Sequence, residues 1–283
     1  IPFMKYIKAV FRMPVPLEED IMQVYADNAA TTKMSAVAIQ AMLPYFDKIY
    51  GNPSSLHSAG QEAKEALEDA RARIAACLGC EPREIYFTSG GSEADNQAIL
   101  SAARLGARKG KKHIISTAFE HHAVLHTLEK LKKEGYEITL LDVKNNHNVT
   151  AQQVRDAIRE DTCLVTTMDA NNEIGSILPI PEIGAVCKEA GVPFHTDAVQ
   201  SFLKVPFAAK TLGADLITVS SHKVHGPKGA GALYIAPRLK SFPALLIGGG
   251  QESNFRSGTE ATPAIFGFAA ACAAVSATFR EDS

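Results

Sequence analysis

The stretch EIYFTSGGSEADN, residues 84–96, combines the two signals that decide the fold. Its first part is mostly apolar or aromatic, which favours a buried strand, and the Ser-Gly-Gly-Ser turn after it opens a helix near Ser92. Similar runs of strand length recur at residues 113–116, 138–142, 164–168, 193–197, 216–220 and 232–236. Helical patterns lie between them, over 58–78 and from starts near His121, Ala151 and Pro181. Strand and helix therefore alternate along the chain.

This alternation predicts an α/β fold with three layers, in which helices cover both faces of a mostly parallel, seven-stranded sheet. Parallel strands need long crossover connections, and the helices supply them. The run at 232–236 differs because only a glycine-rich loop separates it from the run at 216–220. That loop is too short for a crossover, so we expect one antiparallel strand.

The helix over residues 58–78 can be predicted in more detail. Ser58 is a candidate N-cap, and Gly79 lies just past the end. The helical period places the apolar side chains on one face, made up of Ala63, Leu67, Ala70, Ile74 and Leu78.

The composition excludes several classes of protein. Twenty-nine basic against 31 acidic side chains give a formal charge of −2, so no overall field favours nucleic acid or an acidic membrane surface. The apolar runs are shorter than the roughly 18 to 20 residues that cross a bilayer. Five scattered cysteines do not form a disulfide framework. We expect a cytoplasmic protein without a nucleic-acid or membrane partner.

Polar residues follow five of the predicted strands at the point where each strand ends. They occupy residues 89–93, 117–122, 169–173, 196–200 and 220–223. Ligands of open α/β sheets bind beyond the carboxyl ends of the strands. These five segments therefore predict one rim that holds a binding site.

Three features of this rim have an ordinary and a functional interpretation. Gly91 and Ser92 could form only a tight turn and a helix cap, but free amides at a helix N-terminus also suit a phosphate. Asp197 could be an N-cap, whereas a carboxylate buried at a strand end needs a partner such as a protonated pyridinium nitrogen. Lys223 could be a solvated lysine, whereas in a buried site its amine loses its proton more easily and can form an imine.

The remaining polar side chains of the rim extend this pattern. His121 could stack on a flat ring and move a proton, and Asn172 and Gln200 could hydrogen-bond to ring substituents. His121, His122 and His126 have no acidic ligand nearby at zinc-protease spacing, so a metal site is not expected. A phosphate cradle, a carboxylate and an amine on one rim match a single cofactor, pyridoxal 5'-phosphate.

Several segments, taken in order, resemble the cysteine desulfurases of the NifS and IscS type, in the class V aminotransferase family of fold-type I pyridoxal-phosphate enzymes. These segments are YADNAATT (25–32), GNPSS (51–55), FTSGGSEADN (87–96), EH (120–121), NNEIG (171–175), DAVQ (197–200), SSHK (220–223), GPKG (226–229) and RSGT (256–259). The resemblance covers the chain from about Val24 onward.

The resemblance implies a role for each candidate residue. Lys223 would carry the covalent link to the cofactor, Asp197 would hold the proton on the ring nitrogen, and His121 would stack on the ring and assist proton transfer. Asn172 and Gln200 would touch the hydroxyl side of the ring. The phosphate would lie against Gly91, Ser92, Ser220 and His222. Thr259 would reach the phosphate of a neighbouring subunit, which implies a homodimer.

The implied reaction converts L-cysteine to L-alanine and passes the sulfur, as a persulfide on an enzyme cysteine, to an acceptor protein for iron-sulfur cluster or thio-cofactor assembly. In the family, the nucleophilic cysteine and a substrate-binding arginine lie well beyond the RSGT motif. None of the cysteines present matches that position: Cys77, Cys80, Cys163, Cys187 and Cys272. Two alternatives stay open. One is another class V activity, such as a selenocysteine lyase or an amino-acid lyase, and the other is a non-catalytic scaffold.

The same resemblance divides the chain into three segments. Residues 1–23 are expected to be a leader or an artificial extension, because they precede the first matching motif. Residues 24–262 should form the large domain that binds pyridoxal phosphate. Residues 263–283 should begin a long helix that leads to a smaller C-terminal domain, which we expect to be missing from the chain.

Overall fold

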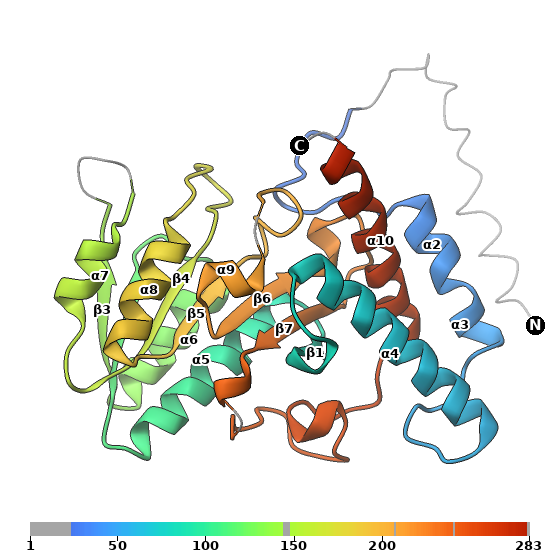
Figure 1. Ribbon diagram of the computed structural model, residues 1–283, viewed down its shortest axis with the longest axis horizontal. Coiled ribbons are helices and arrows are strands. Elements are labelled where there is room, and N and C mark those ends of the chain that lie inside the picture. Colours follow the sequence, from blue (N-terminus) through green and yellow to red (C-terminus); the bar gives the residue numbers. More distant parts are fainter. Residues whose placement is uncertain (1–23, 144–147, 207, 240, 282–283) are drawn as a thin grey trace, which may run out of the picture.

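The computed structural model describes residues 24–143, 148–206, 208–239 and 241–281. Its strands form one sheet in the order β1-β7-β6-β5-β4-β2-β3 (Figure 1). The strands are β1 (Ile85–Thr88), β2 (His113–Thr117), β3 (Glu137–Leu141), β4 (Thr162–Met168), β5 (Phe194–Asp197), β6 (Leu216–Ser220) and β7 (Gly231–Ile235). The predicted seven-stranded sheet is therefore confirmed within the described residues.

Strand β7 runs antiparallel to both of its neighbours, β1 and β6. The pairs β2–β3, β2–β4, β4–β5 and β5–β6 are parallel. This confirms the expectation of one antiparallel strand. The short connection from β6 to β7 leaves no room for a helical crossover, and the longer connections each contain a helix.

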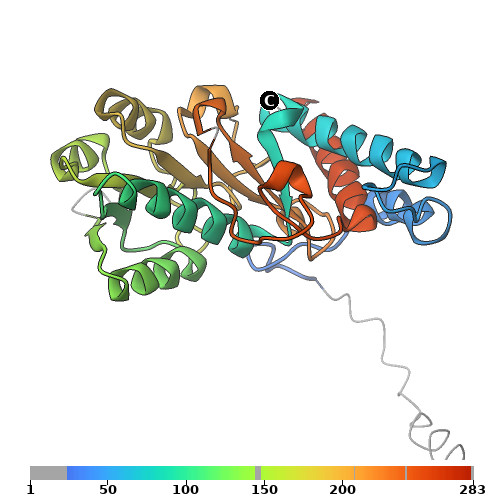
Figure 2. The same cartoon turned by 90° about the horizontal axis from the view of Figure 1, so that it is seen from below.

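Helices cover both faces of this sheet (Figure 2). They are α2 (Ala36–Met42), α3 (Pro44–Asp47), α4 (Ser58–Leu78), α5 (Gly91–Ala107), α6 (His122–Lys133), α7 (Ala151–Ala157), α8 (Ile180–Ala190), α9 (Ala209–Leu212) and α10 (Thr262–Glu281). One apolar core joins α4, α7, α8 and α10 to one face, and a second joins α5 and α6 to the other. Two cores separated by a sheet define the predicted three-layer α/β/α architecture.

Helix α4 has the boundaries that the sequence predicts. All of its predicted apolar positions are buried, with Leu67 the most exposed of them at 3%. Gly79 ends the helix in the left-handed conformation. The cap prediction is wrong, because His57 and not Ser58 is the N-cap. The backbone is extended at His57, whose Nδ1 accepts a hydrogen bond from the Gly60 amide at 3.3 Å.

The last described helix, α10, lies beside α2 and α4 (Figure 1). Its buried side chains include Phe268 and Cys272, which pack in the same core as Ile74 of α4. The predicted helix from residue 263 onward is confirmed as far as Glu281. The proposed leader, residues 1–23, lies outside the described residues.

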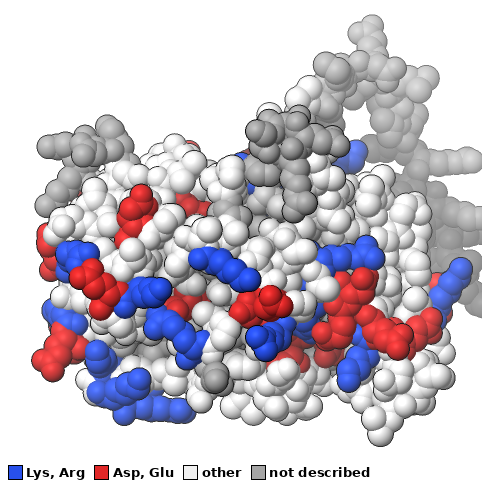
Figure 3. All heavy atoms as spheres, in the orientation of Figure 1, with Lys and Arg blue, Asp and Glu red and all other residues white. Residues whose placement is uncertain are grey.

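Two properties of the described residues concern the classes of protein considered above. No described helix has the length and apolar character needed to cross a membrane. On the face shown in Figure 3, Lys and Arg side chains are interspersed with Asp and Glu side chains. The prediction that nucleic acid is not a partner rests on the formal charge alone and stays a prediction.

Candidate active site

A cavity of about 450 Å³ lies at the carboxyl ends of β4, β5 and β6, against the N-terminus of α5. The strand-end rule predicts a site at this edge of the sheet. Nine of the ten predicted site residues line the cavity. They are Gly91, Ser92, His121, Asn172, Asp197, Gln200, Ser220, His222 and Lys223. Residues that are distant in the sequence therefore meet at one place because their strands are neighbours and point the same way.

Lys223 enters the cavity from the single helical turn that follows β6. Its side chain is nearly buried, and Nζ donates hydrogen bonds to the carbonyl oxygens of Ala29 and, at 2.8 Å, Ala30. Burial lowers the pKa of Lys223, and the nearby carboxylates of Asp197 and Asp27 oppose this shift. A lysine of this kind is neutral more often than one in water, so its amine is available as a nucleophile.

Asp197 is the last residue of β5 and is 6% exposed. One carboxylate oxygen, Oδ1, accepts a hydrogen bond from the Val199 amide at 2.9 Å. Burial raises the pKa of Asp197 to about 6, although the Val199 hydrogen bond and the charge of Lys223 act in the opposite direction. A buried carboxylate whose pKa is still raised lacks a sufficient positive partner, and a cation bound in the cavity would supply it.

The turn that precedes α5 is shaped to bind an anion. Gly90 has φ 148° and ψ −177°, a conformation essentially restricted to glycine, and it leaves the first turn of α5 without a side-chain cap in the described chain. A Cβ at Gly91 would lie 2.9 Å from Cγ2 of Val199, so this position also needs glycine. The exposed amides at the start of this 17-residue helix favour a phosphate or another anion.

Three further predicted residues lie at the cavity with defined partners. His121 caps α6, because its Nδ1 accepts a hydrogen bond from the Ala123 amide at 3.1 Å. Burial, together with the charges of His122 and Lys223, lowers the pKa of His121, so the neutral ring is favoured. Gln200 donates from Nε2 to the Ala29 carbonyl at 2.8 Å, and the Nδ1 atom of His222 lies 3.0 Å from Oγ1 of Thr31.

Thr259 is the one predicted site residue that does not line this cavity in the described chain. It is exposed and lines a separate surface hollow together with Ile247, Gln251 and Ser257. This position does not test the prediction that Thr259 serves a neighbouring subunit, because one chain alone is described.

The family follows from a comparison with known protein families. A family model described as aminotransferase class-V matches residues 24–282. The chain belongs to this family. Among curated class V relatives, it is 50% identical over 245 residues to "Putative cysteine desulfurase IscS 1" of Bacillus subtilis and 48% identical over 260 residues to "Cysteine desulfurase IscS" of Methanosarcina thermophila. These alignments cover 87% and 92% of this chain, and the chain spans 64% of the length of either relative.

Solved structures of class V proteins have the same fold. A structure described as a NifS-like protein superimposes with a TM-score of 0.88 at 38% identity, covering 92% of this chain and 71% of that one. The structure described as SspA in complex with cysteine gives a TM-score of 0.84 at 40% identity, covering 88% of this chain and 72% of that one. The predicted fold class is confirmed by these likenesses.

Sequence reasoning missed several groups of this class V site. The carbonyls of Ala29 and Ala30 hold Lys223, yet they follow no strand and the strand-end rule could not find them. Asp95 also lines the cavity and is 1% exposed. It lies one helical turn after Gly91, and this i, i+4 spacing on α5 was the available signal.

Asp95 is a second carboxyl group beside Asp197. Its Oδ1 lies 3.6 Å from Nε2 of His195 and has no hydrogen-bond partner among the described residues. Burial and the nearby Asp197 raise the pKa of Asp95 well above its usual value. Burial also lowers the pKa of His195 to about 3, so this imidazole is neutral. We infer that, of these two carboxyl groups, Asp95 is the protonated one and Asp197 is the ionised one.

The cysteines lie elsewhere in the protein. None of the five lines the cavity formed by the described residues. Burial raises the pKa of Cys80, Cys163 and Cys187 to about 12. Because the thiolate is the reactive form, these side chains are poor nucleophiles near neutral pH. No group of His, Cys, Asp and Glu within the described ranges is arranged to hold a metal ion.

Glu120 is a further buried carboxyl group, and its titration can be tested through the stability of the protein. It is 6% exposed, and Oε1 accepts hydrogen bonds from Oγ1 of Thr117 at 2.5 Å and from the Met168 amide at 2.9 Å. Burial raises the pKa of Glu120 from 4.5 to about 8. Its contribution to stability is therefore complete below about pH 4.5 and is lost as the pH rises through about 8, because the folded state must then bury a charge.

Glu120→Gln removes this titration and keeps the shape of the neutral acid. Since one pKa unit corresponds to about 1.4 kcal/mol, we expect the wild type to lose at least about 1 kcal/mol more stability than the variant between about pH 5 and pH 8. Urea unfolding of both proteins at the two pH values measures this difference. Parallel pH profiles for the two proteins would show that Glu120 is ionised in the folded state throughout.

Proposed function

We propose that residues 24–262 form a cofactor-binding domain for pyridoxal 5'-phosphate, and that this domain carries the cofactor chemistry of a cysteine desulfurase. The observation that supports this proposal is the meeting of three groups in one cavity: the amine of Lys223, the carboxylate of Asp197 and the uncapped N-terminus of α5. No other common cofactor needs an amine for a covalent link, an acid for a ring nitrogen and a cradle for a phosphate at once.

The residues present fit this cofactor. Lys223 would hold the aldehyde carbon and Asp197 the ring nitrogen, where a positive charge would offset the cost of its burial. The phosphate would lie against the amides of Gly91 and Ser92, with Ser220 and His222 beside them. His121 would stack on the ring, while Asn172 and Gln200 would contact its hydroxyl side. When bound, the cofactor supplies an electron sink for a carbanion at Cα of an amino acid.

Each protein group then has a defined task. The substrate's own amine would replace Lys223 at the aldehyde carbon. The Lys223 amine released in this way, whose pKa is lowered by burial, would then accept the proton from Cα of the substrate. Asp197 would keep the ring nitrogen protonated, and Asp95 would remain neutral beside it. The carbonyls of Ala29 and Ala30 would orient the Lys223 amine.

We further propose L-cysteine as the substrate and an acceptor protein as the destination of its sulfur. The curated names of the relatives support this choice, as does the solved structure described as a complex with cysteine. A homodimer, in which Thr259 serves the phosphate of the partner subunit, would explain why Thr259 lies apart from the cavity. All five cysteines lie in the described residues and form no disulfide there, which agrees with a reducing compartment such as the cytoplasm.

The covalent site can be tested directly. The wild-type chain is incubated with pyridoxal 5'-phosphate, reduced with borohydride, digested and analysed by mass spectrometry. We expect the added mass on the peptide that contains Lys223. The same mass on a different lysine, or on none, would contradict the proposed cofactor site.

The substrate requires a second measurement. The cofactor-loaded chain is given L-cysteine, L-selenocysteine or L-serine, together with a dithiol as sulfur acceptor, and alanine is quantified. We expect slow alanine formation from L-cysteine, because no cysteine of the described chain lines the cavity. Preference for L-selenocysteine would favour a lyase instead, and no alanine from any substrate would favour a scaffold.

A further inference from the structure

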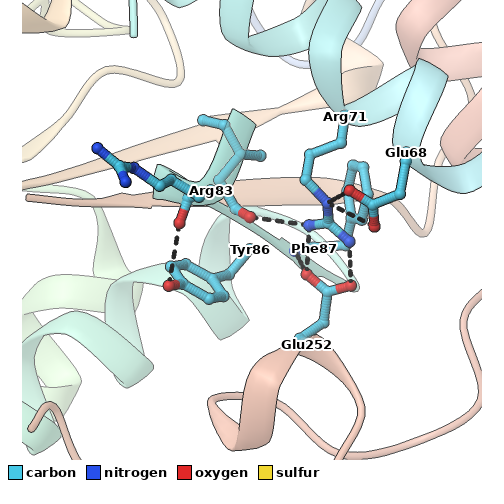
Figure 4. Close-up of polar contacts among 7 residues, drawn as sticks. Glu68, Arg71, Arg83, Tyr86, Phe87 and Glu252 are labelled. Atoms are coloured by element: carbon cyan, nitrogen blue, oxygen red, sulfur yellow. Dashed lines mark hydrogen bonds and ion pairs between the residues drawn. The ribbon is translucent and has the colours of Figure 1, made fainter. Parts of the chain in front are cut away.

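The segment of residues 252–256 follows β7 in the chain and contacts both β1 and α5. Its first residue, Glu252, is 7% exposed and binds two elements at once (Figure 4). The carboxylate accepts hydrogen bonds from the two terminal nitrogens of Arg71, both at 2.8 Å, and from the Phe87 amide at 2.7 Å. Glu252 therefore fixes the segment to β1, one residue before the anion-binding turn of residues 88–92 begins.

Arg71 completes this buried cluster. Its guanidinium donates to the Ile85 carbonyl at 2.8 Å and lies 4.6 Å from the centre of the Phe87 ring. Glu68 contributes a further contact at 3.3 Å. Arg71 thus compensates the charge of the buried Glu252 carboxylate. Because two nitrogens face two oxygens, this bidentate pair also fixes the orientation of both side chains.

The backbone of the segment is held in an unfavourable conformation. Glu252, Ser253 and Asn254 have φ values of 48°, 55° and 68°, and none of them is glycine. Three consecutive left-handed residues persist only where surrounding contacts determine the conformation, and such strain is concentrated at functional sites. Phe255 adds one of those contacts by packing on Tyr86 of β1, with ring centres 4.5 Å apart.

Arg256 binds the other side of the anion-binding turn. Its Nε and terminal nitrogen donate to the two carboxylate oxygens of Glu93, at 2.7 Å and 3.1 Å. Glu93 lies in the first turn of α5 and also accepts a hydrogen bond from the Ser89 amide at 2.9 Å. Burial acts to raise the pKa of Glu93, but these hydrogen bonds outweigh it and lower the pKa, so the ion pair is formed near neutral pH.

We propose that residues 252–256 brace the anion-binding turn 88–92, and that Glu252 and Arg256 are positioning residues for the phosphate of the cofactor. The brace holds the strand that enters the turn and the helix that leaves it, so the amides of Gly91 and Ser92 keep a fixed geometry. It also neutralises Glu93, whose charge would otherwise repel a phosphate at the start of α5. This inference rests on the proposed function.

The test compares two ligands that differ only in the phosphate, pyridoxal 5'-phosphate and pyridoxal. Lys223 and Asp197 belong to the turn after β6 and to β5, whereas the brace contacts β1 and α5, so both ligands can use them. For Arg256→Gln we expect roughly tenfold weaker binding of pyridoxal 5'-phosphate, the size of one lost charge-assisted hydrogen bond, and pyridoxal binding within about twofold of wild type. Titration of the visible absorbance of the bound ligands measures both affinities.

Three further variants make the result decisive. Arg155→Gln breaks an exposed pair with Glu189 on α8, at 2.8 Å, and should change neither affinity. Combining Glu93→Gln with Arg256→Gln should weaken phosphate binding no further than Arg256→Gln does, because the two residues act as a pair. Arg256→Lys keeps the charge and should recover part of the loss.

The outcomes separate this inference from the proposed function. If Arg256→Gln weakens both ligands equally, or neither, the brace does not act on the phosphate and the inference is wrong. If the wild type binds neither ligand at Lys223, the proposed function itself fails. If Arg256→Gln weakens the binding of pyridoxal 5'-phosphate and leaves that of pyridoxal unchanged, the result supports both the inference and the proposed function.

Discussion

A chain that carries Lys223→Ala is expected to form no covalent bond to pyridoxal 5'-phosphate. The amine at this position is the one lysine nitrogen among the residues that line the described cavity, and the pKa of Lys223 is lowered by burial. The expected effect is complete loss of the visible absorbance of the lysine-bound cofactor, with no added mass after borohydride reduction. Binding of the phosphate by α5 should remain, because Lys223 does not form the first turn of that helix.

Lys204 provides a matched control for this experiment. It lies near the site, where it donates from Nζ to Oε1 of Gln200 at 3.3 Å, and burial lowers its pKa as well. Lys204→Ala removes a similar amine that does not line the cavity, so we expect it to keep the covalent bond. A covalent adduct that survives Lys223→Ala but disappears in Lys204→Ala would show that the reactive lysine has been misassigned.

Much of the fold could be predicted from the sequence because burial leaves a local pattern. The apolar face of α4 follows the helical period, and the short loop before β7 alone shows that this strand is antiparallel. The N-cap of α4 was assigned to the wrong residue because an imidazole is an unusual cap and Ser58 is a common one. Which of the two residues caps the helix depends on the backbone angles at His57 and Ser58, and these angles cannot be predicted from the sequence pattern.

The candidate site was predictable to the extent that topology determines it. Residues after parallel strands meet at one edge of the sheet whatever their distance in the sequence, which is why Asp197 and Lys223 share a cavity. Ala29 and Ala30 stand in the YADNAATT segment, but their contact with Lys223 was missed because a sequence motif does not show which backbone carbonyls face the cavity. The brace of residues 252–256 was missed for a related reason, since its contacts join positions about 160 to 180 residues apart.

Asp95 and Asp197 lie next to each other, and only one of them is expected to pair with a bound cation. Asp197 has a hydrogen bond from the Val199 amide and a nearby lysine, both of which favour its ionised form. Asp95 lies deeper, beside a neutral imidazole, and its pKa is raised well above that of a free carboxyl group by burial. Two carboxyl groups in one buried site cannot both ionise cheaply. Of this pair, only Asp197 should therefore carry a negative charge.

Asp197→Asn tests this assignment through the affinity for pyridoxal 5'-phosphate. Asparagine can still accept the hydrogen bond of the Val199 amide, 2.9 Å away, so the end of β5 should keep its structure. It cannot supply the charge that a protonated ring nitrogen needs. Removing one partner of a buried charge pair costs about 2–5 kcal/mol, which corresponds to roughly 30-fold to several-thousand-fold weaker binding.

The matched control is Asp95→Asn, which replaces a carboxyl group that we infer to be neutral already. Because it removes no charge, we expect the affinity for pyridoxal 5'-phosphate to change by less than about threefold. Equilibrium titration of the wild type and both variants near neutral pH gives the three affinities. If Asp95→Asn weakened binding as much as Asp197→Asn, the charge would be shared between the two carboxyl groups or reside on Asp95. If only Asp197→Asn weakens the binding of pyridoxal 5'-phosphate, then Asp95 is protonated in the wild type and Asp197 faces the protonated ring nitrogen.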